Sequence, residues 1–201
     1  LLSEGYHPKD IDKAATSFGM PMGPIRLLDE IGLDVAHKVS EVLTEAYGDR
    51  MQGPKYAEKL VSLGRFGKKS GLGFYKHESH DYLVDPSIAE LLDIGHAWRT
   101  DVDFEALTER LVFTMVNEAV RCLDEGVAGE PGAEAAKQID LATVMGTGFA
   151  PFRGGILFYA ESLGAQNVLL GLEEYVSRGH ERFAPCSGIV RRADEAQSFY
   201  E

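Results

Sequence analysis

The sequence is poor in cysteine and has few positive charges for its length. Its two cysteines, Cys122 and Cys186, are too few for a disulfide framework and fit no metal-ligand spacing, so both are expected to be reduced structural thiols. The 20 Lys and Arg residues are outnumbered by 32 Asp and Glu residues, and the net charge of −12 repels a polyanion. A nucleic-acid partner is therefore not expected.

Long apolar runs and an export signal are also missing. No apolar stretch approaches the ~20 residues that span a bilayer, so no transmembrane segment is expected. Residues 1–5 have neither a charged leader nor a cleavable apolar core. With 44% hydrophobic and 26% charged residues, the composition is that of an ordinary globular domain. We expect a globular protein of the cytoplasm, or of an organelle matrix if a transit peptide was lost.

Helical spacing of apolar residues dominates the first third of the chain. Pro24 suits the first position of a helix whose apolar face holds Leu27, Leu28 and Ile31. Asp34 can cap a second helix, with Gly48 just past its end. The apolar face predicted for that second helix consists of Val35, Val39, Val42, Leu43 and Ala46.

The same spacing continues through the rest of the chain. A long helix is expected over about 103–125, and its predicted apolar stripe is Leu107, Leu111, Met115, Ala119 and Cys122. Strand signal is confined to a turn and a short extended piece at 71–76. The sequence therefore predicts a mainly α fold. Further helices are expected over about 55–63, 133–145, 155–163 and 165–178.

An internal repeat is visible in the order of four short blocks. Each block in the first part has a counterpart in the second, and the offsets drift from 121 to 132 residues. The first series is Leu2–Ser–Glu–Gly5, Ile11–Asp–Lys–Ala14, Gly19–Met–Pro21 and Asp29–Glu–Ile–Gly32, and the second is Leu123–Asp–Glu–Gly126, Ile139–Asp–Leu–Ala142, Gly148–Phe–Ala–Pro151 and Glu161–Ser–Leu–Gly164. This order predicts a first repeat over 1–95, cut within its first helix, and a second, degenerate repeat over 96–201. We expect residues upstream of Leu1.

Two long motifs carry a family resemblance. Residues 18–34 read FGMPMGPIRLLDEIGLD and residues 64–75 read GRFGKKSGLGFY, and in this order they resemble the C-terminal domain of 3-hydroxyacyl-CoA dehydrogenases. Residues 117–126 and 148–155 resemble the degenerate second repeat of multifunctional fatty-acid oxidation α-subunits. Without the resemblance, the glycine and proline turn is a rigid connection between helices.

The resemblance implies an architecture and an absence of chemistry in this chain. Two tandem helical repeats would pack about a pseudo-twofold axis, with residues 21–34 and 151–164 in equivalent positions. The N-terminal Rossmann domain, which binds NAD and carries the catalytic His and Glu, would lie outside this chain. No catalytic residue and no cofactor are therefore expected here. The second repeat has Glu109 where the family has a catalytic Asn, and Asn117 is interpreted as a packing residue.

The resemblance also places a substrate wall. Pro21 and Leu27 match positions that help to line the fatty-acyl tunnel, and Met22 is adjacent to them. An apolar wall suffices there because each buried methylene contributes ~0.8 kcal/mol. The alternative is that these residues pack against the Rossmann domain without touching substrate.

A contact with anionic CoA is hypothesised for Arg65, Lys68 and Lys69. Residues 64–76 carry four cations and no acid. The alternative is a solvated turn.

No metal or nucleotide site is expected. His37 lies off its helix's apolar stripe, His77 and His80 lie in the predicted linker, and His180 follows Gly179. Residues 146–148 read GTG but lack a third glycine and follow a helix instead of a strand.

The leading hypothesis is the substrate-binding and assembly portion of an NAD-dependent L-3-hydroxyacyl-CoA dehydrogenase of fatty-acid β-oxidation, inactive by itself. Its partners would be the 3-hydroxyacyl-CoA substrate, upstream Rossmann and enoyl-CoA hydratase domains, and a thiolase subunit. Two alternatives stay open: a non-catalytic helical assembly module, and the helical domain of another Rossmann-linked β-hydroxyacid dehydrogenase. The twenty residues upstream of Leu1 would distinguish them, because only the first hypothesis needs an Asn-Arg pair there.

Overall fold

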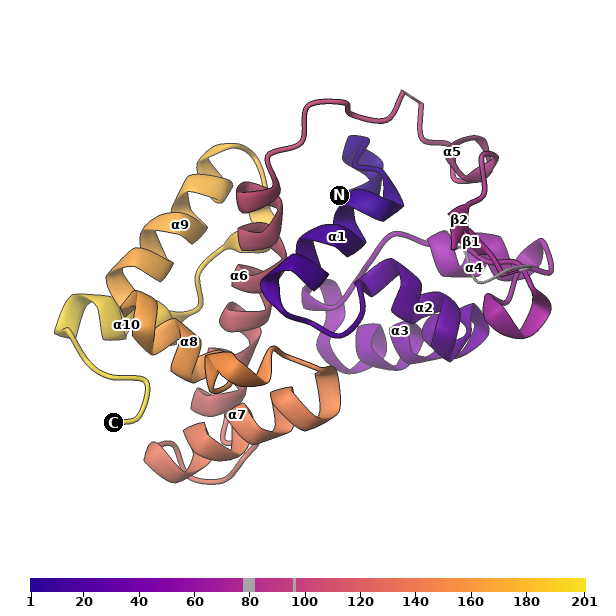
Figure 1. Ribbon diagram of the computed structural model, residues 1–201. Coiled ribbons are helices and arrows are strands. Elements are labelled where there is room, and N and C mark those ends of the chain that lie inside the picture. The colour runs from indigo at the N-terminus through magenta and orange to yellow at the C-terminus, as the bar shows by residue number, and fades with distance from the viewer. Residues whose placement is uncertain (78–81, 96) are drawn as a thin grey trace. The chain divides into compact units, whose positions relative to one another are not determined.

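The computed structural model describes residues 1–77, 82–95 and 97–201 and is mainly helical, as predicted (Figure 1). Within these residues, no helix is long and apolar enough to cross a membrane. The α-helices are α1 (Pro8–Phe18), α2 (Pro24–Ile31), α3 (Leu33–Tyr47), α4 (Tyr56–Ser62), α5 (Ile88–Leu91), α6 (Phe104–Asp124), α7 (Ala133–Thr147), α8 (Ile156–Leu163), α9 (Ala165–Ser177) and α10 (Ser187–Glu195). The short 3-10 turns are Leu2–Glu4, Gly48–Arg50, Lys68–Ser70, Pro151–Arg153 and Glu181–Phe183, and the strands are β1 (Tyr75–Lys76) and β2 (Leu83–Val84).

The chain divides into two compact units. The first unit consists of Leu1–Thr16 and Met22–Phe104, and the second consists of Ser17–Pro21 and Glu105–Glu201. These units are defined by packing, whereas the predicted boundary at 95/96 separates sequence repeats. That boundary and the pseudo-twofold axis stay predictions.

The first unit has a core between its helices and its short sheet. Leu33, Leu60, Phe74 and Ile88 are almost completely buried. Strands β1 and β2 are antiparallel, with Tyr75 opposite Val84, which confirms the short extended piece predicted at this position. Helix α1 was not predicted, because its buried face includes two small alanines and the polar Asp12 beside Ile11 and Phe18.

Helix α3 forms as predicted, but its predicted core face is on the surface of the first unit. Val35, Val39 and Val42 are 46%, 50% and 65% exposed, and Leu33 is the residue of this helix that is buried. Apolar periodicity identifies a helix but not what covers its apolar face. Within the first unit, this face is left open to solvent.

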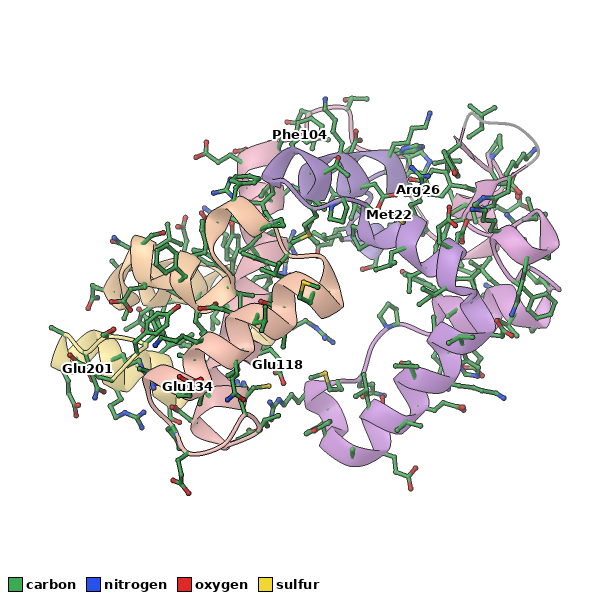
Figure 2. All side chains as sticks on the ribbon, turned by 60° about the horizontal axis from the view of Figure 1, so that its bottom comes forward. Met22, Arg26, Phe104, Glu118, Glu134 and Glu201 are labelled. Atoms are coloured by element: carbon green, nitrogen blue, oxygen red, sulfur yellow. The ribbon has the colours of Figure 1, made fainter. Side chains whose placement is uncertain are left out.

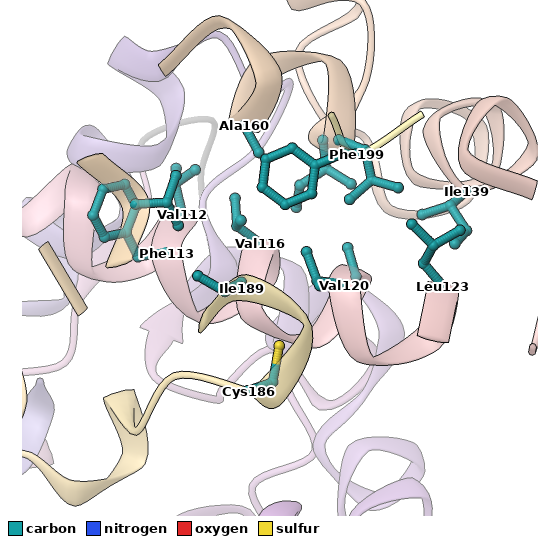
Figure 3. Close-up of a cluster of buried hydrophobic side chains, with 14 of the residues drawn as sticks. Val112, Phe113, Val116, Val120, Leu123, Ile139, Ala160, Cys186, Ile189 and Phe199 are labelled. Carbon is teal, nitrogen blue, oxygen red and sulfur yellow. The ribbon is translucent and has the colours of Figure 1, made fainter. Parts of the chain in front are cut away.

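The second unit is built around α6. The most deeply buried residues of α6 pack with side chains from α7, α8 and α10, as Figure 3 shows for Ile139, Ala160 and Ile189. Of the stripe predicted for α6, Leu107 and Ala119 are buried, whereas Leu111, Met115 and Cys122 are half-buried. Neighbours pack on more than one side of α6, so the buried set is broader than a single stripe. It contains Val112, Phe113, Val116, Val120 and Leu123.

Helix α10 was also not predicted. Its sequence, SGIVRRADE, has few apolar residues, although Ile189 is fully buried and Arg192 is 3% exposed. Arg192 donates a hydrogen bond to Asp124 at 3.0 Å, so the helix packs through a charged side chain as well as apolar ones. A hydrophobic pattern does not detect such a helix.

Candidate functional site

The segment with the first family motif is held by a buried carboxylate. Asp12 of α1 accepts hydrogen bonds from the backbone N–H groups of Ile25 at 2.8 Å and Arg26 at 3.0 Å. Those groups belong to the first turn of α2 and have no partner within the helix. The Tyr75 hydroxyl donates a third hydrogen bond to Asp12 at 2.6 Å. Asp12 therefore caps α2 from outside and joins it to the segment that contains the second motif.

A second buried carboxylate joins α2 to the same segment. Asp29 is 0% exposed and accepts hydrogen bonds from the backbone N–H groups of Phe74 at 2.9 Å and Tyr75 at 2.8 Å. The Nε2 atom of His77 lies 2.9 Å from the same carboxylate. We call the set of Asp12, Asp29, Tyr75 and His77 the aspartate frame.

The placement of His77 in a linker is wrong. Its side chain is 4% exposed and pairs with Asp29. His80, assigned to the same linker, lies outside the described residues. The pairing of His77 could have been predicted from its position two residues after Tyr75, because Tyr75 donates its backbone N–H to Asp29.

Glycines of both motifs are required by close approach to these carboxylates. A Cβ atom on Gly23 would lie 2.2 Å from Cβ of Asp12, and one on Gly73 would lie 2.1 Å from Oδ1 of Asp29. Gly67 has φ +83°, and its Cβ atom would lie 2.3 Å from the Asp29 carbonyl oxygen. The motifs therefore have glycine at these positions because Asp12 and Asp29 leave no room for a side chain.

Burial shifts the pKa of two members of the frame, Asp12 and Tyr75. Burial raises the pKa of Asp12 above its ordinary value, and hydrogen bonds from Tyr75, Ile25 and Arg26 oppose that rise. The pKa of Tyr75 is raised strongly, first by burial and then by its hydrogen bond to Asp12. Tyr75 is therefore a neutral hydroxyl donor at all physiological pH values.

The predicted acyl-wall residues are near α2. Figure 2 shows Met22 and Arg26 at the beginning of this helix. Met22 is half-buried, and Leu27 is 42% exposed. Pro21 belongs to the second unit, where its ring packs against Gly148. Met22 and Leu27 thus present apolar surface on a helix whose first turn is fixed by Asp12.

The structure corrects the prediction for Arg65. This side chain is 6% exposed, donates to the Gly73 carbonyl oxygen at 2.6 Å and pairs with Asp85 at 2.7 Å. It supports the second motif from inside and is not available to CoA. The sequence interpretation counted no acid in residues 64–76, but acids distant in sequence lie beside these cations.

The other two predicted CoA contacts also have acidic partners. Lys68 pairs with Glu30 at 2.7 Å, and Lys69 pairs with Asp34. A phosphate would have to compete with these carboxylates, so the structure adds no support to the CoA contact. It stays a prediction for both lysines.

The second unit contains a matching arrangement. Asp140 of α7 accepts hydrogen bonds from the backbone N–H groups of Leu157 at 2.7 Å and Phe158 at 3.2 Å, at the start of α8. A Cβ atom on Gly155 would lie 2.3 Å from Cβ of Asp140, and the Tyr200 hydroxyl donates to Asp140. Asp140, Gly155 and Tyr200 thus repeat the contacts of Asp12, Gly23 and Tyr75.

Phe199 and Tyr200 are the part of this arrangement that the sequence analysis missed. Phe199 donates its backbone N–H to Glu161 at 2.8 Å, as Phe74 does to Asp29. A Phe-Tyr pair is a weak signal by itself. The distance in sequence from the aspartate to the tyrosine could have identified the pair: it is 60 residues from Asp140 to Tyr200 and 63 residues from Asp12 to Tyr75.

The interpretation of Asn117 as a packing residue is confirmed. Its Nδ2 donates to the Ala184 carbonyl oxygen at 2.9 Å, and its Oδ1 accepts from the Cys186 backbone at 2.9 Å. Glu109 lies half-buried on α6 beside Tyr175. The pKa of Tyr175 is raised by burial first and by the Glu109 charge second. The equivalence of Glu109 to a catalytic Asn stays a prediction.

Residues 146–148 do not have the geometry of a dinucleotide-phosphate loop. A dinucleotide phosphate is held at a helix N-terminus that follows a strand. Residues 146–148, the glycine pair considered above, lie instead at the C-terminal end of α7, with Gly148 in the left-handed region as its C-cap. No group of His, Cys, Asp and Glu able to hold a metal ion occurs among the described residues.

Comparison with known proteins first finds a family that the first part of the chain matches. The family described as "3-hydroxyacyl-CoA dehydrogenase, C-terminal domain" matches residues 1–77, which include both motifs and the whole aspartate frame. The fold agrees with this match. A 3-hydroxybutyryl-CoA dehydrogenase from Escherichia coli K12 superposes with a TM-score of 0.72 at 23% identity, over 96% of this chain and 56% of that one. The dehydrogenase part of multifunctional enzyme 1 from C. elegans gives 0.63 at 23% identity, over 93% and 42%.

The particular relatives are longer proteins. The chain is 40% identical over 204 residues to the fatty acid oxidation complex subunit alpha of Shewanella frigidimarina (strain NCIMB 400) and 40% identical over 203 residues to that of Shewanella loihica (strain ATCC BAA-1088 / PV-4). These matches cover 100% of this chain and 28% of each relative. The resemblance to 3-hydroxyacyl-CoA dehydrogenases and fatty-acid oxidation α-subunits is confirmed.

Proposed function

We propose that this chain is the substrate-binding and assembly portion of an NAD-dependent L-3-hydroxyacyl-CoA dehydrogenase of fatty-acid β-oxidation. The observation that carries the proposal is the aspartate frame, because it accounts for both family motifs and fixes the helix that presents Leu27. NAD and the catalytic His and Glu belong to a Rossmann domain outside residues 1–201. A cytoplasmic location stays a prediction.

The proposed role of the first unit is to hold an apolar wall for the acyl chain. Met22 and Leu27 present apolar groups on or next to α2, and Pro21, which precedes Met22 in the sequence, stays a predicted contact of the acyl chain. Asp12 fixes the first turn of α2 through two backbone hydrogen bonds. The position of the helix that carries Leu27 is therefore set by the fold of the first unit. Each methylene of substrate buried on such a wall contributes ~0.8 kcal/mol of binding free energy without geometric selectivity.

The relatives support a place in a larger assembly. Their name, fatty acid oxidation complex subunit alpha, describes a subunit of a complex, and this chain spans 28% of their length. We propose upstream Rossmann and enoyl-CoA hydratase domains and a separate thiolase subunit.

We further propose that the second unit is a duplicate of the first. The matching contacts of Asp140 and Asp12 support this proposal. Its role would be assembly and not chemistry, because Glu109 takes the place of the amide and Asn117 is used for packing.

The test uses the longer protein that contains this chain. Leu27→Asp should lower kcat/KM for long-chain 3-hydroxyacyl-CoA substrates more than for short ones, since a carboxylate faces more apolar chain in the longer substrate. Val42→Asp is the matched control: Val42 is 65% exposed on α3 and is not part of the proposed wall. Equal losses at all chain lengths, or equal effects of the two substitutions, would refute the acyl-wall assignment.

A further inference from the structure

The segment just before Met22 belongs to the second unit by its packing. Ser17–Pro21 end α1 and begin the connection to α2, yet they pack with residues 105–201. Phe18 is 5% exposed and is part of the hydrophobic core of the second unit, and Met20 packs against the same core. The second unit therefore holds the segment that leads into the proposed acyl wall.

One side chain of the second unit, Arg153, caps the C-terminal end of α1. Its Nε atom donates a hydrogen bond to the carbonyl oxygen of Phe18 at 3.0 Å. Phe18 is the last residue of α1, and a carbonyl oxygen at that position has no partner within the helix. A guanidinium at the C-terminal end of a helix also complements the helix dipole.

Aromatic rings lie beside the same guanidinium. The Cζ atom of Arg153 is 4.0 Å from the ring centroid of Phe18 and 5.3 Å from that of Tyr159. The two rings are in edge contact, with their centroids 5.2 Å apart. Arginine suits this place because its planar, weakly hydrated cation is attracted to the faces of aromatic rings. Arg153 thus holds both the backbone and the side chain of Phe18.

The rest of the segment also packs closely on the second unit. A Cβ atom on Gly19 would lie 2.5 Å from Cε1 of Phe152, so the chain passes directly against this ring. A Cβ atom on Gly148 would lie 3.1 Å from Cγ of Pro21. Residues 148–153 therefore determine where Pro21 lies.

The connection from α1 to α2 is fixed at both ends. At its start, Arg153 holds Phe18. At its end, Gly23 packs against Asp12, which leaves no room for a side chain. The residues between these ends, 19–22, include both apolar residues that are predicted to meet the acyl chain ahead of α2. A shift of Phe18 would displace them but leave α2 in place, because Asp12 fixes that helix separately.

We propose that Arg153 is a positioning residue for the acyl wall: it fixes Phe18, and through Phe18 it sets where Pro21 and Met22 meet the acyl chain. Long-chain 3-hydroxyacyl-CoA substrates depend on it most, because apolar contact grows with each methylene. This inference rests on the proposed acyl wall. It gives the second unit a part in substrate affinity besides its proposed role in assembly.

The experiment uses the longer protein that contains this chain. Arg153→Met keeps the aliphatic stem of the side chain and removes the guanidinium. For 3-hydroxyhexadecanoyl-CoA, KM should rise about 4- to 15-fold, the equivalent of one to two buried methylenes. The KM for 3-hydroxybutyryl-CoA, and kcat for both substrates, should change by less than about twofold, since the proposed catalytic His and Glu lie outside residues 1–201.

Two further substitutions separate positioning from a general loss of structure. Arg153→Lys keeps a charged donor for the carbonyl oxygen of Phe18 but loses the planar stack, so its KM for the long substrate should lie between those of Arg153→Met and the unchanged protein. Arg178→Met is the matched control. Arg178 also lies near a tyrosine ring, but its side chain is 58% exposed and pairs with Glu174, so both KM values should stay unchanged.

Phe152→Ala tests the same role without changing a buried side chain. This ring is 75% exposed and lies against Gly19. Its removal should raise KM for the long substrate by a smaller factor than Arg153→Met does, and circular dichroism checks that each variant keeps its helices.

Leu27→Asp is measured in parallel, so that failure of this inference can be told from failure of the proposed function. A chain-length-selective loss with Leu27→Asp but not with Arg153→Met or Phe152→Ala would overturn the positioning role and leave the acyl wall intact. No selectivity in any of the three variants would overturn both. An equal rise in KM for both substrates with Arg153→Met would also overturn the positioning role, because a general packing defect does not depend on acyl length.

Discussion

Removal of the Tyr75 hydroxyl is the sharpest test of the aspartate frame. Tyr75→Phe keeps the ring, which is 3% exposed, and deletes the 2.6 Å hydrogen bond to Asp12. A buried hydrogen bond to a charged group contributes ~1.5–3 kcal/mol. We therefore expect a loss of ~2 kcal/mol in the free energy of unfolding at pH 7. With a urea m-value of ~2 kcal/mol/M, the unfolding midpoint should fall by ~1 M.

The pH dependence of this loss has a predictable sign. Burial raises the folded-state pKa of Asp12, and the Tyr75 hydrogen bond lowers it. Deleting the bond raises the folded pKa further, so the variant loses stability as pH rises from the unfolded value of ~3.9 through the folded pKa. Below ~3.9 the carboxyl is protonated in both states, and the loss should shrink toward the ~1 kcal/mol of a neutral hydrogen bond.

The assay is urea unfolding of the chain, followed by circular dichroism at pH 7 and at pH 3.5. Tyr200→Phe is a matched variant in the second unit, since Tyr200 donates to Asp140 in the same way. A Tyr75→Phe loss below ~0.5 kcal/mol at pH 7, or a loss that grows as pH falls, would refute the frame as described.

Three further predictions concern a glycine, an ion pair and the isolated chain. Gly23→Ala should cost ~1–3 kcal/mol in urea unfolding through overpacking, whereas Gly53→Ala should be neutral because nothing lies within 4 Å of its added Cβ atom; similar costs would contradict this. The hydrogen bond from Lys68 lowers the pKa of Glu30. This pair therefore stabilises the fold above the unfolded pKa of Glu, and the effect is lost as pH falls through the folded pKa. Lys68→Gln should reduce the acid dependence of unfolding, whereas Lys55→Gln, which removes the exposed pair with Glu58, should not. The isolated chain should form no NADH from 3-hydroxyacyl-CoA in a spectrophotometric assay. Turnover above a heat-denatured control would contradict the proposal that the catalytic His and Glu lie outside residues 1–201.

The sequence predicted the fold class and most helices because periodicity and glycine stops are local signals. It did not predict where two helix faces lie, because Val39 on α3 is exposed in its unit while Val116 on α6 is buried. What covers a helix depends on partners distant in sequence. The sequence shows an amphipathic pattern, but it does not show the partner.

The candidate site was predicted in part for the same reason. The motif glycines were recognised, but their cause is Asp12 and Asp29, whose partners Tyr75 and Phe74 lie 63 and 45 residues away. The basic loop was misjudged because Arg65 pairs with Asp85, 20 residues beyond it. Charge counted in a short window does not include such partners.

The long separation within the aspartate frame has a consequence for synthesis on the ribosome. Asp29 is fully buried, yet its backbone partner Phe74 follows 45 residues later. At a synthesis rate of ~5–20 residues per second, ~2–9 s pass between the two residues, and during this time α2 exists without the groups that satisfy its buried carboxylate. We therefore expect the first unit to fold only after residue 77 has left the ribosome. Nascent chains that stop between 34 and 73 should accordingly remain sensitive to protease in this region.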